Sequence, residues 1–94
     1  MTEPTGYTLD SIPAVRRLFR LQWEEVQNAY VLLYPEGMVQ LNQSAGEILK
    51  RCDGVATVAG IAAELESVFN EADLKGAVIS FLEVAHERGW IERR

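Results

Sequence analysis

Two different spacings of hydrophobic residues divide the chain near residue 42. In the first half, residues 18–23 alternate apolar side chains with Arg20 and Gln22, which predicts a β-strand. Residues 29–34 are apolar on both alternating sets and predict a strand with both faces covered. After a Pro-Glu-Gly turn, residues 37–41 alternate again. The pattern predicts a three-stranded antiparallel meander whose last strand lies at an outer edge.

Beyond residue 42 the hydrophobic residues recur every three or four positions, which predicts helices. A capping box at Ser44-Ala45-Gly46-Glu47 starts the first helix, with Asn42 as a rival cap, and Asp53-Gly54 ends it. Thr57 caps the second helix.

The third predicted helix is the longest. Asn70 caps it, Glu71 and Asp73 complement the helix dipole in its first turn, and Arg88-Gly89 ends it before the short extended segment Trp90-Ile91. Its apolar face is wider than one packed neighbour requires. The main stripe consists of Leu74, Val78, Phe81, Leu82 and Ala85, and it is widened by Ala77, Ile79 and Val84.

These elements predict an α+β fold, a winged helix-turn-helix-like domain in which a three-stranded antiparallel sheet is followed by three helices. Residues 1–11 mix polar residues with Pro and Gly around Tyr7 and Leu9, so we expect a flexible N-terminal arm. Residues 12–94 are expected to form a single domain, since 94 residues can bury one core.

Composition narrows the class of protein. Hydrophobic residues make up 48% of the chain and charged residues 24%, which is typical of globular domains. The longest unbroken apolar run, Ala29 to Tyr34, is far shorter than a membrane span, and no signal-peptide pattern opens the chain. We therefore expect a soluble cytoplasmic protein. The single cysteine, Cys52, is expected to be a structural residue.

Charge argues against a polyanionic partner. The net charge is −5, whereas nucleic-acid binding depends on many contacts from Lys or Arg to phosphate. The one local basic cluster near the N-terminus, Arg16, Arg17 and Arg20, is interpreted as solvated charge.

The residues that usually carry catalysis are absent as groups. His86 is the only histidine and has no Cys/His neighbours with metal-ligand spacing, and the glycines form no phosphate-binding motif. Glu83 and Glu87 are interpreted as the wet face of the third helix, and Ser44 has a capping role. The sequence gives no support for an enzymatic activity, a metal site or a cofactor site.

Two binding modes then compete. A winged-helix regulator would place the third helix in a DNA major groove, but that helix carries more acids than bases. In strand addition, an extended peptide pairs with the edge at residues 38–41 and fills an apolar groove on the third helix. A further alternative is that the extra apolar surface packs against the arm or a second copy of the chain.

The residues also resemble a known family. Phe19 to Glu24, Tyr30 to Gly37, Val39 to Asn42, Cys52-Asp53-Gly54, and Phe81-Leu82 with Arg88 to Ile91 are together similar to the PqqD family of pyrroloquinoline quinone (PQQ) biosynthesis. The resemblance covers about residues 13–92. It implies a peptide chaperone that binds the ribosomal precursor peptide, PqqA, and presents it to a radical S-adenosylmethionine enzyme, PqqE, which cross-links a Glu and a Tyr of that peptide.

The resemblance also implies where the peptide binds. It would add to the strand at residues 38–41 and contact the third helix. The implied contacts are Met38, Val39, Gln40, Leu41, Lys75, Val78, Phe81, Leu82 and Ala85. The surface that meets the radical enzyme is not located by sequence. An exposed strand edge also permits exchange between copies, so a homodimer stays an open alternative.

Overall fold

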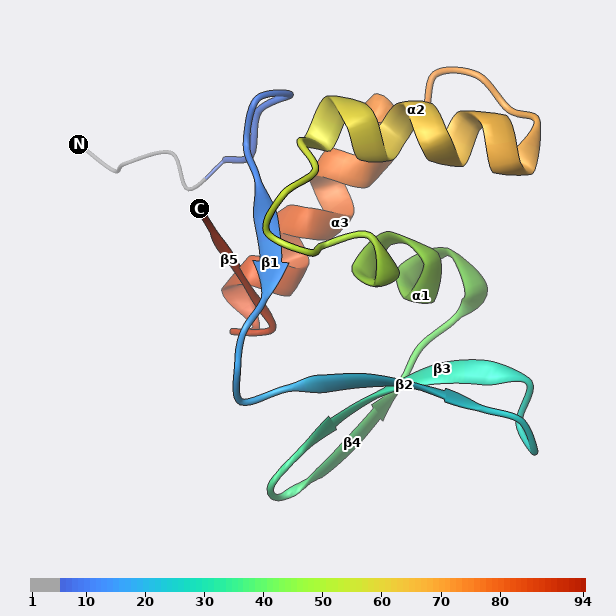
Figure 1. The fold of residues 1–94 in the computed structure, drawn as a ribbon, viewed down its shortest axis with the longest axis vertical. Helices are drawn as coiled ribbons and strands as arrows, with labels where there is room; N and C mark the ends of the chain where they lie inside the picture. The colour runs from blue at the N-terminus through green and yellow to red at the C-terminus, as the bar shows by residue number, and fades with distance from the viewer. Residues whose placement is uncertain (1–5) are drawn as a thin grey trace.

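Five strands and three helices make up the described part of the chain. The computed structural model describes residues 6–94. Strands β2, β3 and β4 form an antiparallel sheet in the order β2-β3-β4, and β1 pairs with β5 in a second, two-stranded sheet (Figure 1). The predicted α+β fold, with a three-stranded antiparallel sheet followed by three helices, is confirmed. The elements are β1 Pro13–Val15, β2 Arg20–Glu24, β3 Ala29–Tyr34, β4 Gly37–Gln40, α1 Gln43–Lys50, α2 Val58–Phe69, α3 Lys75–Glu87 and β5 Ile91–Arg93.

Strand β3 is the centre of the larger sheet, and only one of its faces packs on helices. Figure 1 shows the three helices above this sheet with α1 nearest to it. Tyr30 packs so closely under α1 that a Cβ at Gly46 would lie 2.7 Å from its ring, so only glycine fits there. On the outer face, Val31 is fully buried between its cross-strand neighbours Gln22 and Gln40. The predicted cover over both faces is thus supplied by α1 on one side and by flanking side chains on the other.

The short pair of β1 and β5 was not predicted. Val15 pairs with Ile91, and Arg16 N–H donates to Trp90 O at 2.9 Å. The extended segment predicted at Trp90-Ile91 is confirmed at Ile91, where β5 begins and pairs with β1. Strands of three residues carry too little alternation to be recognised from sequence. This pairing joins the segment before the larger sheet to the segment after α3.

Two predicted helix starts need correction. Asn42, the rival cap, begins α1 because its side chain accepts the Ala45 N–H at 2.8 Å, so the predicted capping box at Ser44 is wrong. Thr57 caps α2 as predicted. Asn70 does not cap α3: it ends α2 in the left-handed conformation (φ 53°). Asparagine suits both positions, so its presence alone does not tell a start from an end.

Helix α3 begins later than predicted. Its cap is Leu74, which makes no side-chain capping bond, and Lys75 is the first helical residue. Glu71 and Asp73 therefore precede the helix and do not stand in its first turn. Glu66 of α2 instead accepts the Leu74 N–H at 3.0 Å, which ties the start of α3 to the preceding helix.

The N-terminal segment is packed where it is described. The expected flexible arm covers residues 1–11, of which 1–5 lie outside the described residues. Tyr7 is only 4% exposed. The carbonyls of Leu9 and Ser11 accept the N–H groups of Ala59 and Val58, which are the first donors of α2. Because these donors have no partner inside their own helix, the segment gains fixed bonds there, so residues 6–11 belong to the folded domain.

Candidate functional site

Strand β4 presents an open edge. Within residues 6–94, β3 is the only strand that pairs with it. Leu41 N–H donates to Tyr30 O at 3.1 Å, and bonded and non-bonded pairs alternate along an antiparallel ladder. The backbone groups of Met38 and Gln40 therefore point away from β3. Two N–H and two C=O groups are available to an added strand.

The side chains of this edge divide between the two faces of the sheet. Met38 lies on the outer face and is 48% exposed. Val39 lies on the inner face and packs against the core. Gln40 is exposed and its amide donates to Gln27 Oε1 at 3.1 Å. Leu41 follows β4 and is buried.

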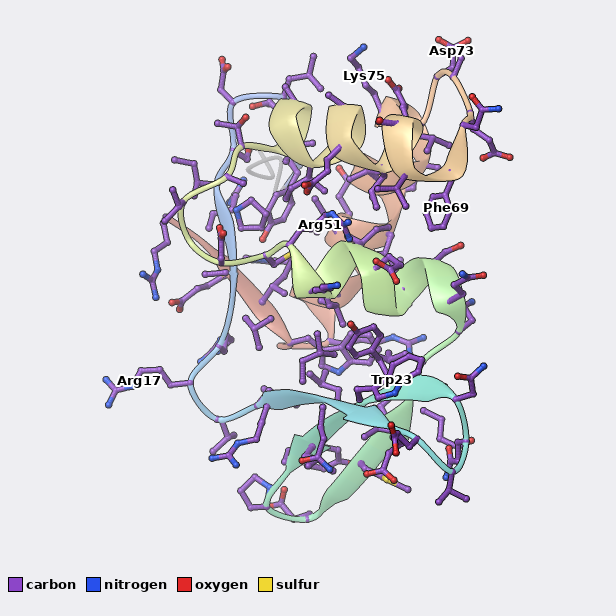
Figure 2. All side chains as sticks on the ribbon, turned by 45° about the vertical axis from the view of Figure 1, so that its right-hand side comes forward. Arg17, Trp23, Arg51, Phe69, Asp73 and Lys75 are labelled. Carbon is purple, nitrogen blue, oxygen red and sulfur yellow. The ribbon has the colours of Figure 1, made fainter. Side chains whose placement is uncertain are left out.

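Helix α3 buries most of the residues that the resemblance assigns to the peptide. Val78, Leu82 and Ala85 are in the core, with Leu82 fully inaccessible. Phe81 is half-buried at the margin of the core. Lys75 is exposed, but Figure 2 shows it at the end of the molecule remote from the β2-β3-β4 sheet. We therefore assign Val78, Leu82 and Ala85 to packing.

One flank of α3 is apolar and open. Ala77, Phe81 and Val84 follow each other at helical spacing on one side of the buried stripe, and Val84 is 43% exposed. We call these three residues the open flank. It continues into a shallow pocket of about 90 Å³ between the three helices. The pocket is lined by Ser44, Ile48, Leu65, Phe69, Glu71, Leu74, Ala77 and Val78.

The pocket brings β4 and the helices into one region. Ser44 lines the pocket and follows Gln40 by only four residues. The Cα atoms of these two residues are therefore no more than about 14 Å apart. Sequence reasoning missed the contribution of α1 and α2 to this surface. The only signal was the excess apolar width of α3 at Ala77 and Val84.

The opposite flank of α3 is covered by the chain itself. Tyr7 O–H lies 2.8 Å from His86 Nδ1, and the two rings meet edge to face. Arg93 stacks over the Tyr7 ring and donates to Gly6 O at 3.0 Å. Burial raises the pKa of Tyr7 to about 12. His86 thus has a structural partner.

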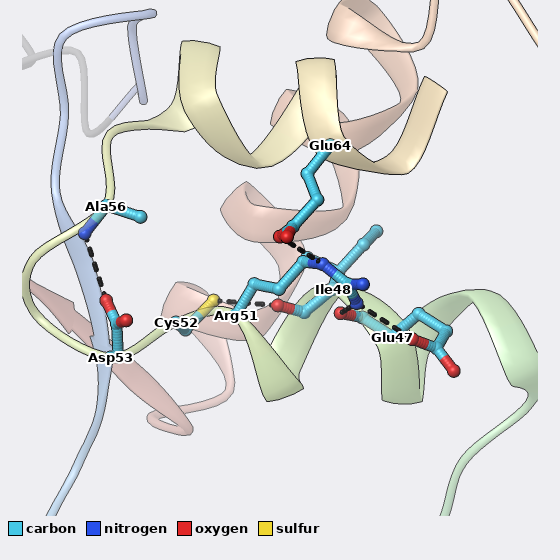
Figure 3. A network of polar contacts seen from close by, with 7 residues as sticks. All are labelled: Glu47, Ile48, Arg51, Cys52, Asp53, Ala56 and Glu64. Atoms are coloured by element: carbon cyan, nitrogen blue, oxygen red, sulfur yellow. Dashed lines mark hydrogen bonds and ion pairs between the residues drawn. The ribbon is translucent and has the colours of Figure 1, made fainter. Parts of the chain in front are cut away.

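An ion-pair network braces α1 against α2. Figure 3 shows Arg51 between Glu47 at 2.8 Å and Glu64 at 2.7 Å.

Cys52 follows Arg51 in the chain and is buried. Burial raises the pKa of the Cys52 thiol to about 12, and Cys52 Sγ donates to Ile48 O. The burial of Cys52 agrees with its predicted structural role, and the network holds together two walls of the pocket.

Charges around α3 do not favour a DNA surface. Glu83 and Glu87 are exposed on the helix, and Glu71 and Asp73 are exposed just before it. Phosphates would be repelled by these four carboxylates, which outnumber Lys75 and Arg88. Across residues 6–94 no three His, Cys, Asp or Glu side chains gather in a way that would hold a metal ion, and no helix is long and apolar enough to cross a membrane.

Comparison with known proteins gives consistent matches. Residues 29–91 match the family model described as coenzyme PQQ synthesis protein D (PqqD). The chain is 56% identical over 86 residues to the PqqA binding protein of Azotobacter vinelandii, covering 90% of this chain and 94% of the relative. It is 48% identical over 85 residues to the PqqA binding protein of Klebsiella pneumoniae, covering 89% and 92%.

Two solved structures are also similar. The solution NMR structure of the PqqD truncation of Methylobacterium extorquens PqqCD is described as a functional, stand-alone recognition element for ribosomally synthesised, modified peptides. It has a TM-score of 0.81 and 32% identity, covering 98% of this chain and all of that one. The crystal structure of PqqD from Xanthomonas campestris has a TM-score of 0.51 and 32% identity, covering 86% and 92%.

Proposed function

The chain belongs to the PqqD family, and we propose that it binds the precursor peptide PqqA and presents it to the radical S-adenosylmethionine enzyme PqqE in PQQ biosynthesis. In this role the chain is a peptide chaperone with no catalysis of its own. The names of the two curated relatives and the description of the M. extorquens structure support peptide binding.

The observation that carries this proposal is the open edge of β4. Met38 and Gln40 direct their backbone groups to solvent. Pairing with β3 already holds β4 in an extended conformation. An extended peptide can satisfy these groups without unfolding any part of the domain. The peptide's own side chains would alternate between the two faces of the enlarged sheet.

Backbone pairing alone is not sufficient for tight binding. Four hydrogen bonds at about 1 kcal/mol each contribute about 4 kcal/mol, whereas a dissociation constant of 1 μM corresponds to about 8 kcal/mol. Apolar contacts must supply the difference. The open flank of α3 and the adjoining pocket provide accessible apolar surface, and the pocket includes Ser44, which follows β4 closely in the chain, so we assign them to the peptide's apolar side chains.

The candidate contacts follow from accessibility. Met38 and Gln40 would contact the peptide through their backbones, and Val39 and Phe81 through partly accessible side chains. Leu41, Val78, Leu82 and Ala85 would support the surface from below. Lys75 is exposed at the end of the molecule remote from the sheet, so a peptide would reach it only by continuing past the pocket. The binding domain includes residues 6–11 together with the expected domain at 12–94.

Titration of isotope-labelled chain with PqqA tests the proposal. Amide signals of residues 37–42 and 74–86 should shift progressively, while a scrambled peptide of the same composition should leave them in place. Shifts confined to α1, or equal shifts with the scrambled peptide, would contradict the proposed site.

A homodimer through β4 would compete with the peptide for the same edge. Sedimentation at several chain concentrations, with and without PqqA, measures this competition directly. The cytoplasmic location stays a prediction.

A further inference from the structure

Four arginines belong to the two segments that meet where the β1–β2 turn lies beside the end of α3. Arg16, Arg17 and Arg20 stand in and after the turn, and all three are exposed. Arg16 N–H donates to Trp90 O, and the Arg88 guanidinium lies 5.5 Å from the centre of the Trp90 ring. Segments distant in the sequence thus meet at one corner. We call this group, with Leu18, the basic corner.

The charge of the basic corner is opposite in sign to the net charge of the rest of the chain. Between Asp10 and Glu24 there are three arginines and no acidic residue, so this stretch carries +3. The net charge of the whole chain is −5, and the remaining 81 residues therefore carry −8. Within residues 6–94, ion pairs are made by Arg51 and Arg94 but by none of the four arginines of the corner.

The turn of the basic corner is hydrogen-bonded and carries an accessible apolar side chain. Phe19 N–H donates to Arg16 O at 2.9 Å, which closes the turn, and the Phe19 ring packs against Tyr34. Leu18, between the arginines, is 63% exposed. Figure 2 shows Arg17 extending away from the body of the molecule. Arginines around an accessible apolar side chain are typical of protein interfaces. There a planar guanidinium group can bind one carboxylate through two parallel hydrogen bonds.

We propose that the basic corner docks an acidic surface of the enzyme that modifies the bound peptide. This inference rests on the proposed function. DNA or an anionic membrane is extended, so it would be repelled by the net charge of −8 on the remaining residues. A local patch of carboxylates on a protein would contact only the basic corner.

Position supports the same partner. The corner adjoins β2, and β3 separates β2 from the open edge of β4. At about 4.8 Å between neighbouring strands, a peptide added to β4 would lie about 14 Å from β2. One enzyme can therefore hold the corner and reach the peptide without displacing it.

Charge reversal tests the proposal on the full chain. R17E/R20E and the control K50E/R94E both change the net charge from −5 to −9, and the control positions are exposed away from the corner. Titration calorimetry measures the affinity for PqqE in the presence of PqqA, and the affinity for PqqA alone. We expect R17E/R20E to weaken PqqE binding at least tenfold, the control to weaken it less than threefold, and PqqA affinity to stay within twofold. L18S should weaken PqqE binding about threefold.

The outcomes separate the two proposals. Equal effects of the two double variants on PqqE, or loss of PqqA binding by R17E/R20E, would overturn the docking surface while leaving peptide binding by the wild-type chain intact. Failure of the wild-type chain to bind PqqA would overturn the proposed function itself. Loss of binding to phosphatidylglycerol vesicles or DNA by R17E/R20E, without change toward PqqE, would assign the corner to that polyanion and also overturn the proposal.

A cross-linking experiment gives positive evidence. R17K/R20K keeps the charge and introduces amines that a carbodiimide couples to carboxylates. In the complex with PqqE, mass spectrometry should find positions 17 or 20 joined to Asp or Glu of the enzyme. Cross-links only at Lys50 and Lys75, with none at positions 17 and 20, would contradict the proposed contact.

Discussion

The two flanks of α3 lie in different environments. One flank, around His86, is covered by Tyr7, which is buried and hydrogen-bonded. The other, formed by Ala77, Phe81 and Val84, borders an apolar pocket and is left partly accessible. The same helix thus uses one flank for stability and leaves the other available to a partner.

This difference explains why an apolar stripe is a poor guide to contacts. The centre of the stripe is the least accessible part of the helix, and only its margin reaches solvent. A residue can therefore be essential to the surface without touching the peptide. Substitutions at the centre and at the margin should separate stability from binding.

The largest expected effect is on stability, at the centre of the stripe. L82A removes a fully buried side chain and should lower the free energy of unfolding by about 2–5 kcal/mol. V84A, on the open flank, should lower it by less than about 1 kcal/mol and weaken PqqA binding about threefold by loss of apolar contact. Urea denaturation and peptide titration measure both. Equal destabilisation by the two variants would erase the distinction between centre and margin.

The next effect concerns the strand edge beside the open flank. Q40P removes an N–H that points to solvent, together with the side-chain bond to Gln27, whereas Q40A removes only the side-chain bond. Proline is tolerated at an edge position of this kind. Q40P should weaken PqqA binding roughly 5- to 30-fold, from about 1–2 kcal/mol for the lost hydrogen bond and the steric block.

Q40A is the matched control and should stay within twofold of the wild-type affinity. If Q40P binds PqqA as well as Q40A does, the peptide does not pair with β4.

The covered flank predicts an effect on stability without an effect on binding. Y7F removes the hydrogen bond to His86 and should cost about 0.5–1.5 kcal/mol, with PqqA affinity unchanged. Thermal denaturation and peptide titration measure the two. A loss of PqqA affinity in Y7F would mean that the covered flank also belongs to the binding surface.

The same residue predicts a pH dependence. Burial raises the pKa of Tyr7 from 10.0 to about 12, so the unfolded chain loses this proton first as pH rises. The contribution of Tyr7 to the free energy of unfolding is therefore complete below pH 10, and this free energy falls as the pH rises toward 12. Y7F should show a shallower fall over this range in melting experiments.

The smallest expected effect is at the brace behind the pocket. E64Q removes one carboxylate from Arg51 while Glu47 remains, and Glu64 is mostly exposed. Such a change should cost no more than about 1 kcal/mol. R51M removes both pairs and should cost more. Urea denaturation of the two variants, in low and high salt, tests whether α1 and α2 are joined through Arg51.

Much of the fold follows from local patterns. The unbroken apolar run at residues 29–34 predicted the central strand, and Thr57 predicted the start of α2, because each depends on neighbours in the sequence. Asn70 misled because its side chain and backbone suit either end of a helix. The sequence predicted a site on an edge strand and a helix, but it did not show which of the predicted residues are accessible, since periodicity shows which residues share a face and not how deeply each is buried.

By itself, the sequence determined the order of strands and helices, the outer position of β4 and the resemblance to the PqqD family. These depend on hydrophobic period, turn chemistry and motifs that are read along the chain. Tertiary structure decided that Tyr7 covers one flank of α3, that β1 pairs with β5, and that Arg16 of the β1–β2 turn bonds to Trp90. Each of these joins residues separated by about 70 or more positions, and contacts at such separation leave no local pattern for sequence to show.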